Sequence, residues 1–259
     1  MRILISNDDG IQAPCLKVLM EVFSEIKNCE VLIVAPSHER STTGHSLNLR
    51  RPIQIDELSK NFYSVDGFPA DCIIAALRYL WKETPPDIVI SGVNRGGNLG
   101  QDIFYSGTVG AAREAAFHLI PSMSVSLAVE FNNKFKDLPK DFAYAANFLK
   151  QLILNNITKL IPPRFFLNIN VPYDKNIVGA KIAKHGFRKY SGSVIPFQSP
   201  REKTFFWIGT DYQGYKEIED SDCKLIDQGY ISITPIGYLT EVYPYTNELQ
   251  KLIETLILD

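Results

Sequence analysis

Residues 2–10, with the sequence RILISNDDG, contain a short apolar run followed at once by two carboxylates and a glycine. Ile3 to Ser6 is short, apolar and rich in β-branched residues, which predicts a buried strand that ends at the polar residues. After Pro14 the apolar residues recur at the spacing of one helix face, at Leu16, Leu19, Met20 and Phe23. A buried strand followed by an amphipathic helix begins a βαβ unit, so this stretch favours an α/β fold.

The same alternation of strands and helices continues along the chain. Continuous apolar runs such as Val31 to Ala35 and Asp87 to Ser91 suit parallel strands that are covered on both faces. The pattern therefore predicts an α/β core of three layers, with a mostly parallel sheet between helices. Further strands are predicted at residues 47–55, 62–65, 123–127, 165–171 and 229–234, and further helices at residues 70–81, 108–119 and 142–149.

From about residue 181 the character of the sequence changes. Ile182 to Arg188 and Thr204 to Ile208 predict two strands around a polar stretch, which would form a β-hairpin arm projecting from the main body. Leu249, Leu252, Ile253 and Leu256 predict a closing amphipathic helix. We expect one domain over residues 1–259, with an α/β core at 1–180 and 219–240, the arm at 181–218 and a helical segment at 241–259.

Composition narrows the class of protein. The chain has 259 residues, of which 45% are hydrophobic and 22% charged, values ordinary for a globular protein. A net charge of −2 provides no bulk basic field, so a nucleic acid polymer is not an expected partner. The four cysteines form neither a C-x-x-C pair nor a disulfide framework, and no stretch approaches the about 18 apolar residues of a membrane span. We therefore expect a cytoplasmic protein with no membrane partner.

Polar residues follow the predicted strands at the edge where α/β sheets bind ligands. Asp8 and Asp9 come directly after the first strand, and two adjacent carboxylates either shift a pKa or recruit a cation. Carboxylate, hydroxyl and amide oxygens suit Mg²⁺ or Mn²⁺ better than zinc, and Asn94 and Ser41 lie in two other strand-end loops. The same residues also suit turns, helix caps or a solvated loop.

Ser106, Gly107 and Thr108 open a predicted helix whose early residues are small. The N–H groups at a helix N-terminus favour an anion such as phosphate, although Ser or Thr there is also an ordinary N-cap. The neighbouring loops hold four further candidates for substrate binding, which could equally serve turns or the surface: Arg40, His45, Arg95 and Asn98.

Three common motifs are missing from the sequence. It contains no G-x-G-x-x-G after the first strand, no G-x-x-x-x-G-K-[ST] and no G-x-S-x-G. These absences argue against a dinucleotide oxidoreductase, a P-loop NTPase and a serine hydrolase of the α/β type.

The motifs together resemble the SurE family of stationary-phase survival proteins. The resemblance rests on residues 3–14 (ILISNDDGIQAP), 34–36 (VAP) with Arg40-Ser41, 91–100 (SGVNRGGNLG) and 105–109 (YSGTV), and it continues more weakly in 168–172 (NINVP) and 229–235 (GYISITP). One departure is Cys15, where the family usually has glycine. The resemblance implies a Rossmann-like core and a metal held by Asp8, Asp9, Ser41 and Asn94, with Asp8, Asp9 and Asn94 as the catalytic residues.

The function implied by the resemblance is that of a 5′-nucleotidase. Such an enzyme hydrolyses nucleoside 5′-monophosphates to nucleoside and phosphate with Mg²⁺ or Mn²⁺, and 3′-monophosphates and short polyphosphate are further candidate substrates. The family also exchanges its arm between subunits, which implies a homodimer or homotetramer. Two alternatives stay open on the residues alone: a magnesium-binding phosphoacceptor signalling domain, and a nucleotide-binding protein without turnover.

Overall fold

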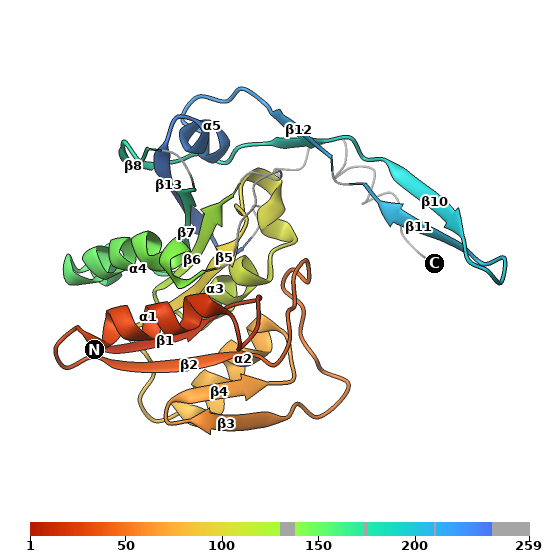
Figure 1. Cartoon of the computed structure of the whole chain (residues 1–259). Coiled ribbons are helices and arrows are strands. Elements are labelled where there is room, and N and C mark those ends of the chain that lie inside the picture. Colours follow the sequence, from red (N-terminus) through yellow and green to blue (C-terminus); the bar gives the residue numbers. More distant parts are fainter. Residues whose placement is uncertain (130–137, 174–175, 210, 240–259) are drawn as a thin grey trace, which may run out of the picture.

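The computed structural model describes residues 1–129, 138–173, 176–209 and 211–239. Its centre is a nine-stranded sheet (Figure 1). The strands of this sheet are β1 (Arg2–Ser6), β2 (Glu30–Pro36), β3 (Ile55–Ser59), β4 (Phe62–Val65), β5 (Ile88–Arg95), β6 (Ser122–Ala128), β7 (Phe165–Pro172), β8 (Gly179–Ile182) and β13 (Tyr230–Gly237).

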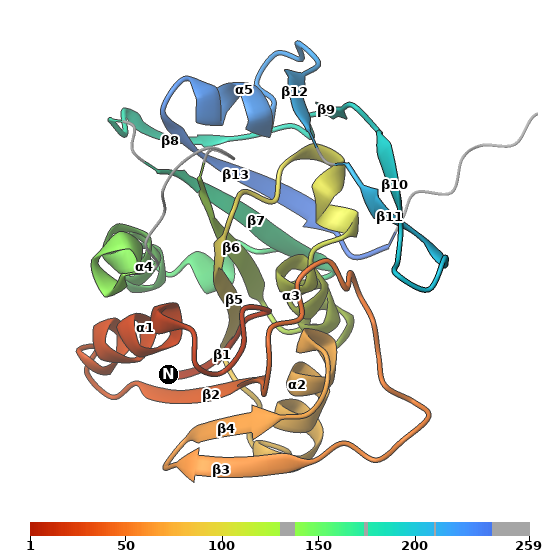
Figure 2. The same cartoon turned by 45° about the vertical axis from the view of Figure 1, so that its right-hand side comes forward.

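Helices cover both faces of this sheet (Figure 2). One face is covered by α1 (Pro14–Ser24) and α4 (Pro139–Leu154), which contact each other, and the other by α2 (Pro69–Ala75) and α3 (Gly107–Phe117). The short helices are η1 (Ala76–Leu80), η2 (Gly100–Phe104), η3 (Ile157–Lys159) and α5 (Asp222–Asp227).

Strand β1 is buried on both faces of the sheet, which explains its continuous apolar run. Ile3 and Ile5 belong to the core beneath α1 and α4, while Leu4 belongs to the core beneath α2 and α3, and all three are fully buried. Successive side chains of a strand point to opposite faces of a sheet, so a strand covered on both faces needs apolar residues at every position.

The strand order is β3-β4-β2-β1-β5-β6-β7-β13-β8. The six strands from β4 to β7 are parallel, whereas β3 is antiparallel to β4 and β13 is antiparallel to β7. After β1, the chain forms β2 and β4 on one side of β1 and then returns to form β5, β6 and β7 on its other side. This reversal between β1 and β5 is the one found in the doubly wound Rossmann order. The predicted α/β three-layer class is confirmed, and the reversal places the expected ligand crevice at the carboxyl ends of β1 and β5.

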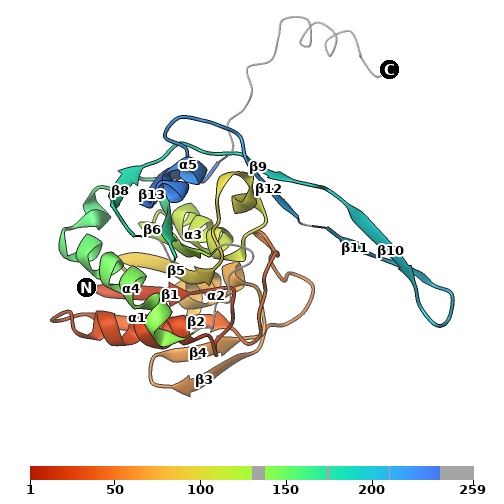
Figure 3. The same ribbon diagram turned by 45° about the horizontal axis from the view of Figure 1, so that its top comes forward.

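An arm projects from the body of the molecule (Figure 3). Its outer part is a hairpin of β10 (Val194–Gln198) and β11 (Thr204–Ile208), and its root is formed by β9 (Arg188–Tyr190) and β12 (Tyr212–Tyr215). The first strand of the hairpin was expected at residues 182–188, which is wrong by about ten residues. Residues up to Ile182 pair with β13 instead, so the hairpin begins only after the chain has left the central sheet.

Two other predicted elements differ from the structure. The helix expected at residues 70–81 begins at Pro69 and widens into a π-helix from Ala76. The strand expected at residues 47–55 forms instead at β3, because backbone partners on β4 are present only from Ile55 onward. The helix expected at residues 249–256 lies outside the described residues. In the parts of the chain that the structure describes, no helix has the length and apolar character that crossing a membrane requires.

Candidate metal and phosphate site

The loops after β1, β2 and β5 meet at the carboxyl edge of the sheet. Ser6 pairs with Ser91 in the parallel register of β1 and β5, so the residues that follow each strand lie at the same edge. The loop after β2 is tied to this point because Arg40 N donates to Asp8 O at 2.7 Å. Three segments distant in sequence therefore gather around the two adjacent carboxylates.

A compact turn sets the direction of these carboxylates. Asn7 is fully buried, and its side chain donates to Gly10 O at 3.0 Å and accepts from Gly10 N at 3.2 Å. Cys15, where the family resemblance expects glycine, is buried behind the turn with its Sγ 3.8 Å from Asn7 Nδ2. The side chain of Asn7 thus replaces the backbone partners that the turn lacks, as Asn commonly does.

The N-terminus of α3 abuts Asp8, which is 3% exposed. Thr108 N donates to Asp8 Oδ2 at 3.0 Å, and the Thr108 hydroxyl donates to Asp8 Oδ1. Only glycine fits at position 107, because a Cβ there would lie 2.9 Å from Asp8 Cβ. Burial raises the pKa of Asp8, and the hydrogen bonds from Thr108 oppose this rise. Both carboxylate oxygens keep a second lone pair with which to bind a cation.

Asp9, the second carboxyl of the site, is held by Arg95. Its side chain is 5% exposed, and Arg95 Nε donates to Asp9 Oδ1 at 3.2 Å. Burial and the neighbouring Asp8 raise the pKa of Asp9 to about 7, against the lowering effect of Arg95. Within the described residues, Asp9 Oδ2 is buried and has no hydrogen-bond partner. A buried carboxylate oxygen without a partner is costly, and a bound cation would remove that cost.

The donor set around Asp8 and Asp9 fits a hard cation. No three His, Cys, Asp or Glu side chains come together as a metal cluster in residues 1–129, 138–173, 176–209 or 211–239, so zinc-type ligation is not indicated there. Asn94 Nδ2 donates to Gly96 O at 2.8 Å, which leaves the amide oxygen as the group that can bind a cation. Oxygen ligands together with waters suit Mg²⁺ or Mn²⁺.

Ser41 reaches this group of residues through Glu39, which the sequence patterns did not identify. Ser41 Oγ donates to Glu39 Oε1 at 2.8 Å, and Glu39 Oε2 lies 3.7 Å from Arg95 Nη2. Arg95 also pairs with Asp9, so its guanidinium group is shared by the carboxylates of Asp9 and Glu39 at the mouth of the site. Glu39 followed no recognised motif, and only its place after β2 could have signalled it.

The other predicted substrate-binding side chains have partners inside the protein. Arg40 Nη2 lies 3.3 Å from Asp66 Oδ1, and His45 Nε2 lies 2.8 Å from Glu114 Oε2. Ser106 caps α3 by accepting from Val109 N at 3.1 Å. These contacts fix the loops around the site, and direct contact of these side chains with substrate remains a prediction.

Asn98 belongs to a buried polar network that sequence reasoning missed. Its side chain donates to Ser126 Oγ at 2.8 Å, and its backbone N donates to Asn170 Oδ1 at 2.8 Å. Asn168 and Asn170 both donate to Asn98 O. The sequence held one signal of this network: in β7, two asparagines alternate with isoleucine and valine in a buried strand. Buried amides need hydrogen-bond partners, so such asparagines indicate a polar network.

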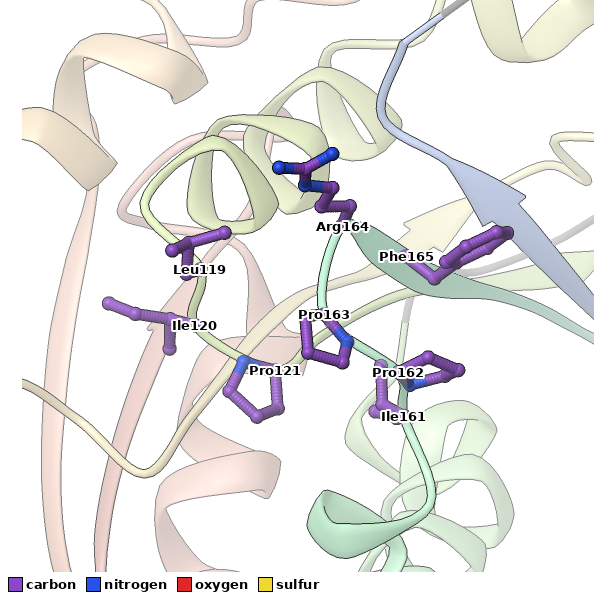
Figure 4. Close-up of a pocket in the computed structure, with 8 residues that line it drawn as sticks. All are labelled: Leu119, Ile120, Pro121, Ile161, Pro162, Pro163, Arg164 and Phe165. Atoms are coloured by element: carbon purple, nitrogen blue, oxygen red, sulfur yellow. The ribbon is translucent and has the colours of Figure 1, made fainter.

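A shallow apolar pocket lies elsewhere, at the amino ends of β6 and β7 (Figure 4). Proline and aliphatic residues line most of it, and the carboxylates of the candidate site are at the opposite edge of the parallel sheet. Its lining offers Arg164 as the single charged side chain among the residues drawn. The residues drawn therefore offer no carboxylate or amide side chain that could hold a divalent cation, as phosphate chemistry at the candidate site requires.

Comparison with known proteins identifies the family. The sequence matches the family described as "Survival protein SurE" over residues 3–192. The chain belongs to the SurE family. Two SurE relatives are both named 5′-nucleotidase SurE: the one from Sulfurimonas denitrificans is 38% identical over 98% of this chain and 99% of its own length, and the one from Geobacter sulfurreducens is 40% identical over 91% and 87%.

A solved SurE structure has the same fold. The crystal structure of the SurE protein from Aquifex aeolicus superposes with a TM-score of 0.81 at 33% identity, and the match covers 99% of both chains. The Rossmann-like SurE architecture expected from the motifs is therefore confirmed.

Proposed function

We propose that this chain is a divalent-metal-dependent 5′-nucleotidase, which hydrolyses nucleoside 5′-monophosphates to nucleoside and phosphate. The observation that carries the proposal is the buried Asp9 Oδ2, which has no partner in the described parts of the chain and lies beside Asp8 at the reversal point of the sheet. The relatives named 5′-nucleotidase SurE support the same activity. Hydrolysis of 3′-monophosphates and of short polyphosphate are finer expectations of the same proposal.

The proposed ligands of the metal are Asp8, Asp9, Ser41 and Asn94, with Mg²⁺ or Mn²⁺ as the ion. When bound, such an ion polarises phosphoryl oxygens and lowers the pKa of a bound water. Thr108 holds the Asp8 carboxylate in one orientation, and Arg95 holds Asp9. The positive end of the α3 dipole at Gly107 lies beside the site and favours the negative charge that develops at the phosphoryl group.

We further propose that the chain is one SurE-like domain of the cytoplasm that assembles as a homodimer or homotetramer through its arm. The hairpin exposes a run of large apolar side chains, and such patches on a soluble surface commonly mark contacts with another protein. The exposed apolar residues of the hairpin are Val194, Ile195, Phe197, Phe205, Phe206, Trp207 and Ile208.

Phosphate release from a panel of nucleotides, with Mg²⁺, with Mn²⁺ and with a chelator, tests the proposed function. We expect metal-dependent release from 5′-monophosphates that is lost in Asp8→Asn and Asp9→Asn. Asp56→Asn, which removes an exposed carboxylate on the edge strand β3, is the matched control and should retain full activity.

Two other functions would give different results in this assay. A phosphoacceptor signalling domain would take up phosphate without releasing nucleoside repeatedly, and a nucleotide-binding protein would bind without release. Full turnover in folded Asp8→Asn and Asp9→Asn variants would refute the assignment of the metal site.

A further inference from the structure

The root of the arm contacts the segment that joins the two halves of the candidate site. This connecting segment, residues 96–105, follows Asn94 on β5 and leads to Ser106 and Thr108 at the start of α3. A shift of the connecting segment would therefore move the proposed ligand Asn94, the α3 N-terminus and, through Thr108, the Asp8 carboxylate.

The main contact is an ion pair between Arg188 on β9 and Asp102 on η2. Arg188 Nη1 donates to Asp102 Oδ2 at 2.7 Å and lies 3.4 Å from Gly97 O. The two side chains are only 10% and 19% exposed, and the Tyr190 hydroxyl donates to the same Asp102 oxygen. A charge-assisted pair that is shielded from water keeps a defined geometry, whereas a surface pair does not.

Backbone contacts reinforce this ion pair. Gln101 accepts from Arg188 N at 2.9 Å and donates to Arg188 O at 2.7 Å, which attaches the connecting segment to the edge of β9. Asp222 accepts from Gly100 N and from Gly186 N, both at 2.9 Å. A Cβ at Gly100 would lie 2.9 Å from Gly186 O, so the two backbones approach as closely as glycine allows.

The opposite side of the connecting segment is held by the sheet, through the hydrogen bonds of Asn98 with Asn168 and Asn170. The segment is therefore clamped between β7 and the arm root. The sheet holds the segment at Gly96 and Asn98, whereas Arg188 of the arm root contacts it at Gly97, Gln101 and Asp102. The arm root is thus a determinant of where the C-terminal part of the segment lies.

We propose that Arg188 and Asp102 form a positioning pair, through which the root of the arm sets the geometry of the phosphatase site. The proposal rests on the proposed nucleotidase function. Neither residue contacts substrate; both act by fixing the connecting segment. Removal of either partner leaves the other charge buried without its counter-charge, so the segment moves toward water and the site loses its alignment. Any displacement of the arm root, including one caused by assembly with another subunit, is expected to change turnover.

A double-mutant cycle in the full-length protein tests this pair. We expect Arg188→Gln and Asp102→Asn each to lower kcat about tenfold, a loss typical of misplacement by a fraction of an ångström. The double variant should be no worse than the poorer single variant, because the two residues act as one unit. Arg188→Lys, which keeps the charge without the planar fork, should recover part of the loss. Arg201→Gln at the tip of the hairpin is the matched control and should behave as wild type.

Amide hydrogen exchange provides a readout that is independent of activity. We expect the amides of residues 97–102 to exchange faster in Arg188→Gln than in wild type, with β1 and β6 unchanged. If wild type releases no phosphate, the proposed function fails while the exchange result still decides the positioning role. Wild-type kcat and wild-type exchange in Arg188→Gln would overturn the proposal, as would additive losses in the double variant. If Arg188→Gln does not fold, Gln101→Ala, which removes two of the root contacts, replaces it in both measurements.

Discussion

Replacement of Asp9 by asparagine should stabilise the protein when no metal is bound. The pKa of Asp9 is raised from its ordinary 3.8 to about 7 because the carboxylate is buried beside Asp8. The folded state therefore holds a proton that the unfolded state releases between pH 4 and 7, and the free energy of unfolding falls as the pH rises through that range. Asparagine keeps the size of the side chain and an oxygen for Arg95, but it carries no charge to bury.

The size of the effect follows from the two pKa values. The difference between about 7 and 3.8 is about 3 pH units. Above pH 7, ionisation of Asp9 therefore lowers the free energy of unfolding of wild type by at most about 4 kcal/mol. At pH 5 wild-type Asp9 is still protonated in the folded state but mostly ionised in the unfolded state. The same calculation then gives a lowering of the free energy of unfolding of about 2 kcal/mol. We expect Asp9→Asn to exceed wild type in free energy of unfolding by more at pH 8 than at pH 5.

Urea denaturation in chelator at the two pH values, at one protein concentration, measures this difference. Asp66→Asn is the control: Arg51 lowers the pKa of the exposed Asp66, so this carboxylate is ionised at both pH values and its replacement should change the free energy of unfolding equally at each. Excess Mg²⁺ or Mn²⁺ should remove most of this advantage at pH 8, since a cation at 100 times its Kd stabilises wild type by about 2.7 kcal/mol. An Asp9→Asn variant that is less stable than wild type in chelator at pH 8 would refute the reasoning.

Three further predictions concern the same structure. Gly107→Ala should lower both metal affinity and kcat/KM, because the new Cβ would lie 2.9 Å from Asp8 Cβ; calorimetric metal titration and phosphate release measure these effects. Thr108→Val should cost about 1–3 kcal/mol in free energy of unfolding by removing a hydroxyl that donates to buried Asp8, and Thr108→Ser should restore most of it in the same denaturation assay. Trp207→Ser on the exposed hairpin should shift the protein toward smaller assemblies in light scattering, and unchanged mass would contradict the proposed role of the arm.

Much of the α/β core could be predicted from the sequence because burial on both faces leaves a clear pattern. Residues 3–6 and 31–35 are continuous apolar runs, and both are central parallel strands. Elements at the margin were predicted less well: β3 begins where β4 offers backbone partners, and the hairpin begins at Val194, twelve residues after its predicted start at Ile182. Exposed strands carry a weak apolar pattern, so their pairing partners decide their position.

Part of the candidate site could likewise be predicted from the sequence, and the rest appeared only in the tertiary structure. Asp8, Asp9 and Asn94 could be assigned to one edge of the sheet from their places after strands, because the carboxyl ends of parallel strands meet there. That Thr108 is bonded to Asp8, a hundred residues away, appeared only in the folded chain. Glu39 and Arg188 likewise became relevant only through their contacts with Arg95 and Asp102.

The sequence by itself determined the class of fold, the family and the chemical type of the site, because these depend on local spacing and on residue types that follow each strand. Tertiary structure alone decided which oxygens are satisfied and which are left for a cation, and which part of the arm is attached to the site. Hydrogen bonds and burial depend on atoms brought together from distant segments, and no local pattern records those distances. The pair of acidic residues in RILISNDDG thus indicated a cation site, and the fold showed that Asp8 is already held by Thr108 while Asp9 retains a buried oxygen without a partner among the described residues.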